Sequence, residues 1–316
     1  KVMWLFYEQP EVDFRDLVQK FMDIRKRAFK FPLLGKKTKF IAIPTTSGTG
    51  SEVTPFAVIS DKANNRKYPI ADYSLTPTVA IVDPALVLTV PGSVAADTGM
   101  DVLTHATEAY VSQMASDFTD GLALQAIKLV FENLESSVKN ADFHSREKMH
   151  NASTIAGMAF ANAFLGISHS MAHKIGAQFH TIHGRTNAIL LPYVIRYNGT
   201  RPAKTATWPK YNYYRADEKY QDIARMLGLP CSTPEEAVEA YAKAVYELGE
   251  RCGIEMNFKA QGIDEKEWKK HSRELAFLAY EDQCSPANPR LPMVDHMQEI
   301  IEDAYYGYKE RPGRRK

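Results

Sequence analysis

The sequence has few cysteines and no excess of charge of one sign. Its three cysteines, Cys231, Cys252 and Cys284, include no C-x-x-C pair. They therefore argue against a disulfide framework and a zinc ribbon, and they favour a reducing, cytoplasmic compartment. With 39 basic and 38 acidic residues, the chain has no electrostatic basis for binding nucleic acid.

Long hydrophobic runs are also lacking. The longest of them, such as residues 188–194, are far shorter than the roughly 20 apolar residues that a membrane-spanning helix requires. The first residues, KVMWLFYEQPEVD, have no long apolar core followed by a small-residue cleavage site. The sequence therefore predicts neither a membrane span nor a secretory signal.

The 316 residues are enough for two domains and a substantial core. The first dozen residues read as the middle of a helix, and residues 12–28 show apolar and charged side chains at helical spacing. Short apolar runs bounded by turn residues predict strands at 39–44, 52–59 and 79–82. These segments are typical of an α/β domain.

After Pro91 the strand signals give way to long amphipathic segments. They predict helices over residues 93–112, 117–138, 146–164, 168–179, 217–227, 234–252, 265–280 and 293–305. We therefore expect a partial α/β domain over residues 1–91 and an all-helical domain over residues 92–316.

The segment GMDVLTHATEAY places Asp101 and His105 four residues apart. On a helix this spacing puts both side chains on one face, a turn apart. Taken alone, such a pair is more often a hydrogen-bonded surface pair than part of a metal site.

Four histidines follow within fifteen residues: His169, His173, His180 and His183. Gly, Ser, Ala and Met surround them, which is the composition of a buried and closely packed segment. Buried imidazoles without partners are costly. One carboxylate and three imidazoles suit a divalent transition metal and leave room for a substrate oxygen. Spacing alone does not choose between His169 and His173 as a ligand.

A third motif is PTTSGTGSE, residues 44–52. Gly48 and Gly50 permit a close approach of the backbone to a ligand, while the neighbouring hydroxyls could bind phosphate or ribose oxygens. A Ser/Thr/Gly-rich turn between strands is more often an ordinary loop. The sequence contains no G-x-G-x-x-G dinucleotide fingerprint.

These motifs, together with the stretches FMDIRKRAFKFPLLG and EDQCSPANPRLP, resemble the iron-dependent (group III) alcohol dehydrogenases. The resemblance covers nearly the whole chain and is greatest to the C-terminal alcohol dehydrogenase domain of bifunctional aldehyde-alcohol dehydrogenases. It implies a dehydroquinate synthase-like fold, with an N-terminally incomplete α/β NAD-binding domain followed by an all-helical metal-binding domain. Relatives carry a Gly-Gly-Gly-Ser segment just before the point where this sequence begins.

The resemblance assigns the metal ligands to Asp101, His105, His169 and His183. It places His173 beside the nicotinamide and the substrate, where it becomes our candidate for relaying a proton. His180 receives no role and is interpreted as structural. The implied metal is Fe²⁺, with Zn²⁺ possible in purified protein because nitrogen-rich sites bind zinc more tightly than iron.

The resemblance also implies cofactor contacts and a substrate pocket. Thr45, Thr46 and Thr49 match a loop at the pyrophosphate and ribose of NAD(H), and Lys67 matches a lysine by the cofactor ribose. Phe56 and Phe160 match positions that face the substrate. Without the resemblance, the lysine would be interpreted as a solvated surface charge and the phenylalanines as core residues.

The implied reaction is the interconversion of short primary alcohols and aldehydes, ethanol and acetaldehyde first, with NAD(H) in fermentation. An alcohol donates hydride poorly until it is deprotonated, and a divalent metal acidifies an oxygen ligand. A lyase or a metal-dependent hydrolase of related fold is the alternative. The TTSGTGSE loop argues against the hydrolase, and the lack of basic residues around the metal motifs argues against the lyase.

The resemblance leaves assembly as a further possibility, because bifunctional relatives form filaments. The aromatic stretch WPKYNYYR, Trp208 to Arg215, is a candidate interface for a filament or a homo-oligomer, and an insertion packed on its own domain is the alternative.

Overall fold

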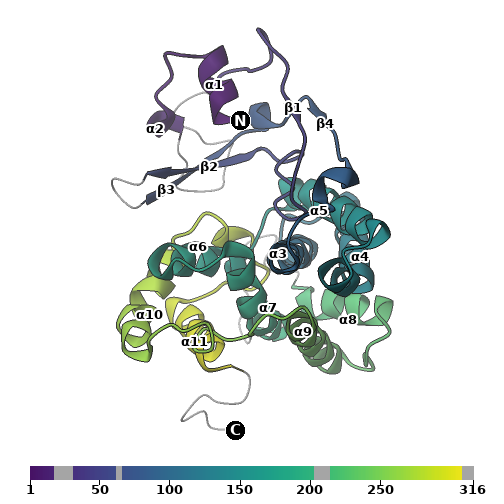
Figure 1. Cartoon of the computed structure of the whole chain (residues 1–316). Helices are drawn as coiled ribbons and strands as arrows, with labels where there is room; N and C mark the ends of the chain where they lie inside the picture. The colour runs from purple at the N-terminus through teal and green to yellow at the C-terminus, as the bar shows by residue number, and fades with distance from the viewer. Residues whose placement is uncertain (18–30, 62–65, 203–213, 308–316) are drawn as a thin grey trace.

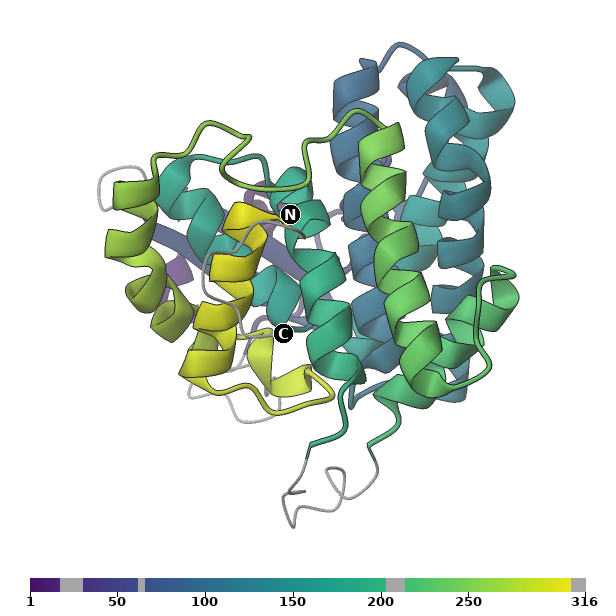
Figure 2. The same cartoon turned by 90° about the horizontal axis from the view of Figure 1, so that it is seen from below.

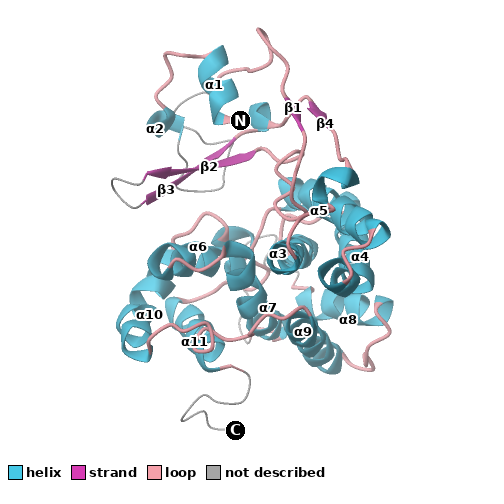
Figure 3. Cartoon of the chain, viewed as in Figure 1, coloured by secondary structure: helices cyan, strands magenta, loops and turns pink. Residues whose placement is uncertain are grey.

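The computed structural model describes residues 1–17, 31–61, 66–202 and 214–307. The strands gather at one end of the molecule, and the long helices form the rest (Figures 1 and 3). The order of strands before long helices in the chain is therefore also a spatial separation.

The N-terminal part holds two small sheets. Helices α1 (Val2–Glu8) and α2 (Phe14–Leu17) precede them. Strand β1 (Ile41–Ala42) pairs in parallel with β4 (Val79–Ala80), and β2 (Phe56–Asp61) pairs antiparallel with β3 (Arg66–Ala71). A small core joins α1, α2 and the β2–β3 sheet and consists of Leu5, Leu17, Phe31, Ile70 and Leu75.

The three predicted strands exist, although β1 and β4 are shorter than expected. Strand β3 was not predicted, because Arg66, Lys67 and Pro69 obscure its apolar pattern. Proline is tolerated in a strand only where its missing N–H is not needed, as in this two-stranded ribbon. The helix expected over residues 12–28 is described only over Phe14–Leu17, since residues 18–30 lie outside the described part.

The remaining chain is helical, with bounds as follows: α3 (Gly92–Val111), α4 (Asp117–Lys139), α5 (Phe143–Ala163), α6 (Ile167–Phe179), α7 (His183–Gly199), α8 (Ala216–Met226), α9 (Pro234–Arg251), α10 (Glu265–Tyr280) and α11 (Val294–Tyr306). Short 3₁₀ turns occur at Tyr73–Leu75, Pro84–Val87 and Ser285–Ala287. All eight predicted helices are confirmed, and the prediction for α10 agrees at both ends.

Helix α7 was not predicted. Pro192 lies inside it, and proline lacks the N–H that a helix interior needs, so the sequence pattern argues against a helix there. The helix forms nevertheless, because α7 is buried between two hydrophobic clusters. Leu191 and Ile195 pack with helices α3, α4, α5, α8 and α9, whereas Leu190 and Val194 pack with α6, α10 and α11.

Figure 2 shows this arrangement from below, with α7 between the two groups of helices. Helix α3 lies against α4, α5 and α7 and is buried along most of its length. Polar side chains on α3 are thereby placed in the interior of the molecule, where they need partners.

Within the described residues, no single helix is long and apolar enough to cross a membrane. The pair α5 and α6 passes on length and composition when taken together, but it is bent by 106°.

Candidate metal centre

Three helices bring the predicted ligands together. Asp101 and His105 come from α3, His169 from α6, and His183 is the first residue of α7. The Asp101 Oδ1 atom lies 3.7 Å from His169 Nε2 and 3.7 Å from His183 Nε2. One ligand atom from each of these three residues lies within 4.8 Å of the others, so they form a set that could hold a metal ion.

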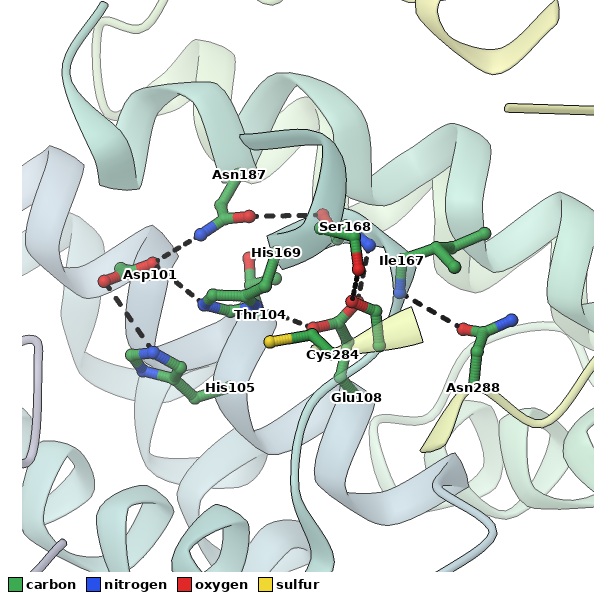
Figure 4. Close-up of polar contacts among 12 residues, drawn as sticks. Asp101, Thr104, His105, Glu108, Ile167, Ser168, His169, Asn187, Cys284 and Asn288 are labelled. Carbon is green, nitrogen blue, oxygen red and sulfur yellow. Dashed lines mark hydrogen bonds and ion pairs between the residues drawn. The ribbon is translucent and has the colours of Figure 1, made fainter. Parts of the chain in front are cut away.

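His105 completes the cluster at a slightly greater distance. Its Nε2 lies 3.9 Å from Asp101 Oδ2, and its ring stacks on His169 with centroids 4.7 Å apart. Figure 4 shows the Asp101 carboxylate in contact with both His105 and His169. His105 does not belong to the three-residue set above.

The donor atoms fit a divalent transition metal. His169 Nε2 is buried without a hydrogen-bond partner among the described residues. A buried polar atom without a partner is unfavourable, and a lone pair of this kind beside a carboxylate calls for a cation. Three imidazole nitrogens and one carboxylate oxygen suit iron and zinc.

The protonation states also suit a cation. Burial raises the pKa of Asp101, but the neighbouring histidines and the Asn187 amide outweigh burial and hold that pKa below its usual value. Burial, with the nearby His105, lowers the pKa of His169 well below 6.5. At neutral pH these groups are therefore a carboxylate and a neutral imidazole, the forms in which they bind metals.

Two polar residues that the sequence analysis did not single out support the cluster. Asn187 Nδ2 donates to Asp101 Oδ1 over 2.8 Å, and Glu108 Oε2 lies 2.6 Å from His169 Nδ1. Burial raises the pKa of Glu108 to about 7. Glu108 follows Asp101 by seven residues and His105 by three on one face of α3, so helical periodicity could have identified it.

An ion pair holds α7 against α3 near the ligands. Arg185 Nε donates to Asp97 Oδ1 over 2.9 Å, and its Nη2 donates to Asp97 Oδ2 over 3.1 Å. Arg185 lies two residues after His183, and Asp97 lies one turn before Asp101. This two-point contact therefore fixes the register in which the two ligands face each other.

His173 lies beside the cluster rather than within the three-residue ligand set. Its ring stacks on His183 with centroids 5.6 Å apart, and its Nδ1 lies 3.2 Å from Asp282 Oδ2. Lys174 Nζ lies 2.8 Å from the same oxygen. His180, by contrast, ends α6 in the left-handed conformation at φ 55°.

The loop at residues 44–52 rests on α5. The Ser47 Oγ atom lies 3.0 Å from His150 Nδ1, and Thr154 Oγ1 donates to Glu52 Oε1 over 2.7 Å. A Cβ added at Gly50 would lie 2.7 Å from Gly157 Cα, so this approach needs glycine. The three predicted cofactor residues lie on the exposed side of the loop: Thr45, Thr46 and Thr49.

Aromatic rings line one side of the cluster. Phe160 stacks on His105 with ring centroids 4.4 Å apart, and Phe56 stacks on Phe160 at 6.0 Å. The two predicted pocket residues are thus in contact with each other and adjacent to a predicted ligand. Lys67 pairs with Ser60 between β3 and β2, but its side chain lies outside the described part. Residues 208–213 of the candidate interface also lie outside it.

Comparison with known proteins identifies a single family. Residues 1–84 match "Iron-containing alcohol dehydrogenase", and residues 95–305 match "Fe-containing alcohol dehydrogenase family, C-terminal". The chain is 97% identical over 316 residues to an aldehyde-alcohol dehydrogenase of Streptococcus pneumoniae serotype 2, covering 100% of this chain and 36% of that protein. The chain thus spans about a third of the length of this curated relative.

Solved structures agree. The iron-containing alcohol dehydrogenase of Thermococcus thioreducens is 36% identical with a TM-score of 0.83, covering 97% of this chain and 74% of that one. A sulfoacetaldehyde reductase of Bifidobacterium kashiwanohense, solved in complex with NAD⁺, is 30% identical with a TM-score of 0.71, covering 87% and 66%. The chain has the fold of the iron-containing alcohol dehydrogenases and belongs to that family.

Proposed function

We propose that this chain is the alcohol dehydrogenase unit of a bifunctional aldehyde-alcohol dehydrogenase. It interconverts short primary alcohols and aldehydes, ethanol and acetaldehyde first, with NAD(H) in cytoplasmic fermentation. The observation that carries the proposal is the buried meeting of Asp101, His169 and His183, with His105 beside them. Family membership favours this reaction over the lyase and the hydrolase considered from the sequence.

The proposed metal is Fe²⁺, held by Asp101, His105, His169 and His183. The family name supports iron, and no comparison supports Zn²⁺. When bound, the metal supplies Lewis acidity toward the substrate oxygen, and the nicotinamide cofactor accepts or supplies hydride. The protein's own contribution is to hold the ligand atoms in a buried position where their charges are weakly screened.

The proposed role of His173 is to carry a proton between the substrate site and the solvent. Its side chain is 25% exposed, in contrast to the 1% exposure of His169. It therefore reaches both the ligand cluster, through its contact with His183, and the surface. Asp282 accepts its Nδ1–H, which leaves Nε2 free to exchange the proton.

The remaining residues complete the proposed site. Thr45, Thr46, Thr49 and Lys67 bind the cofactor, and Phe56 with Phe160 forms an apolar wall that favours short alkyl groups. The bound cofactor in the sulfoacetaldehyde reductase supports NAD(H). Residues 1–91 then form part of the NAD-binding domain and residues 92–316 the catalytic domain, in a dehydroquinate synthase-like arrangement. Assembly into a homo-oligomer or filament stays a prediction.

The test compares wild type with Asp101→Ala and His173→Ala after anaerobic reconstitution with Fe²⁺. Metal analysis gives the bound iron, and NADH absorbance gives ethanol oxidation on the same preparations. We expect Asp101→Ala to lose both. We expect His173→Ala to retain iron while turnover falls by about 10²- to 10⁴-fold, the range for a proton-transfer group.

Two results would contradict the proposal. If wild type binds stoichiometric iron but oxidises no alcohol with NAD⁺, the proposed reaction is wrong. If His173→Ala loses iron, then His173 is a ligand and its assignment as a proton carrier is wrong.

A further inference from the structure

Glu108 occupies an unusual position for a carboxylate, since it is only 2% exposed. Figure 4 shows its side chain between His169 and the start of α6. Its Oε2 lies 2.6 Å from His169 Nδ1, and its Oε1 accepts the Ser168 backbone N–H over 2.7 Å. Both oxygens are therefore used, and both contacts join α3 to α6.

These contacts determine which nitrogen of His169 can bind a cation. When Glu108 is ionised it only accepts hydrogen bonds, and its Oε2, 2.6 Å from His169 Nδ1, then favours the tautomer of His169 that carries its proton on Nδ1. The lone pair then lies on Nε2, which is 3.7 Å from Asp101 Oδ1. Among the described residues, Nε2 has no hydrogen-bond partner.

The backbone of α6 is shaped to receive this carboxylate. Gly166 precedes α6 as its N-cap residue, and a Cβ added there would lie 2.9 Å from Glu108 Oε1. A side chain at this position would crowd the Glu108 carboxylate and the Asn288 amide. The negative charge of Glu108 also lies at the positive end of the α6 dipole, which stabilises that placement.

We propose that Glu108 is a positioning residue for the metal centre: it sets the tautomer and the orientation of His169 and thereby strengthens metal binding. The inference rests on the proposed function, because it assumes a metal at Asp101 and the three histidines. A carboxylate behind a histidine ligand raises the basicity of that ligand, and loss of such a partner typically weakens metal affinity 10- to 100-fold.

The first test is anaerobic titration of the metal-free protein with Fe²⁺ against a chromophoric chelator. We expect Glu108→Gln to bind Fe²⁺ about 10- to 100-fold more weakly than wild type. The matched control is Glu8→Gln, because Glu8 is also buried and accepts the backbone N–H groups of Lys37 and Thr38, but it lies in the N-terminal part. Its affinity for Fe²⁺ should be unchanged. Equal affinities for Glu108→Gln and wild type would overturn the proposal.

The second test does not depend on metal or on activity. In metal-free wild type labelled with ¹⁵N-histidine, nuclear magnetic resonance should show His169 protonated at Nδ1 and not at Nε2. An Nε2–H tautomer would overturn the inference even if the metal binds. If Glu108→Gln does not fold, this spectrum of the wild type still tests whether His169 has the tautomer that the proposal requires. Failure of wild type to bind Fe²⁺ would instead contradict the proposed function. The tautomer measurement would then still test whether Glu108 sets the tautomer of His169.

Discussion

Gly184 determines how closely α7 can approach α3 at the candidate metal centre. It follows His183 directly, and a Cβ added there would lie 2.1 Å from the Asp97 carbonyl oxygen and 3.2 Å from Asp101 Cβ. The nearest of these atoms is backbone, so it cannot move aside as a flexible side chain would. The contact between His183 and Asp101 thus depends on the absence of a side chain at the next position.

We therefore expect Gly184→Ala to displace the start of α7 and separate His183 from Asp101. Overpacking of this kind costs about 1–3 kcal/mol of unfolding free energy, and metal affinity should fall with it. Urea unfolding of the metal-free protein and Fe²⁺ titration measure the two effects. The control is Gly121→Ala on the exposed side of α4, where nothing lies within 4 Å.

At the control position, alanine should stabilise the helix by up to about 1 kcal/mol, because glycine is the poorer helix former. If Gly184→Ala proves as stable as Gly121→Ala and binds Fe²⁺ normally, the close approach of α7 to α3 is not what positions His183.

Among the helices, α5 is the one on which the 44–52 loop packs. His150, Thr154 and Gly157 follow one another at helical spacing on one face, and each contacts the loop. The same helix carries Phe160 beside His105. Helix α5 thus links the loop proposed to bind the cofactor to the predicted ligands.

The burial of His150 against this loop predicts a dependence of stability on pH. Burial lowers the pKa of His150, and the opposing effects of Glu52 and Asp83 are smaller. Below the unfolded pKa of about 6.5, the unfolded chain binds more protons than the folded chain. The stability contributed by neutral His150 is therefore present above that pH and is lost as the pH falls below it.

We expect the stability difference between wild type and His150→Asn to shrink when urea unfolding is measured at pH 5.5 instead of pH 7.5, roughly one unit either side of that pKa. The control is His144→Asn, the same exchange at an exposed position of α5. A constant difference for His150→Asn would show that its imidazole titrates alike in both states.

For the molecule as a whole, the candidate metal centre joins elements from both hydrophobic clusters, because α3 belongs to one cluster, α6 to the other and α7 to both. A ligand that binds only the folded state stabilises it by mass action. We expect free Fe²⁺ at about 100 times its Kd to raise the unfolding free energy by about 2.7 kcal/mol.

Anaerobic thermal unfolding with and without a chelator measures this effect. In Asp101→Ala the chelator should not change the unfolding temperature. An equal response of wild type and Asp101→Ala would place the stabilising metal somewhere other than the proposed centre.

Sequence alone was sufficient for features that depend on neighbouring residues. The spacing of Asp101 and His105 indicated one helical face, and the density of histidines after residue 168 indicated a buried polar cluster. Eight of the helices were predicted from periodicity, because an amphipathic helix repeats its core contacts every three to four residues. The resemblance then separated His169 from His173, which spacing could not do.

Tertiary structure decided the contacts between distant segments. Helix α7 forms despite Pro192 because two clusters bury it, and no local pattern reports that burial. The pairing of Glu108 with His169 spans 61 residues, and that of Ser47 with His150 spans 103. The sequence by itself determined which residues could serve as ligands and which segments could become helices. Only packing determined which lone pair faces Asp101 and which glycine lets α7 come close enough, because such contacts depend on how helices approach one another and not on the order of residues along either helix.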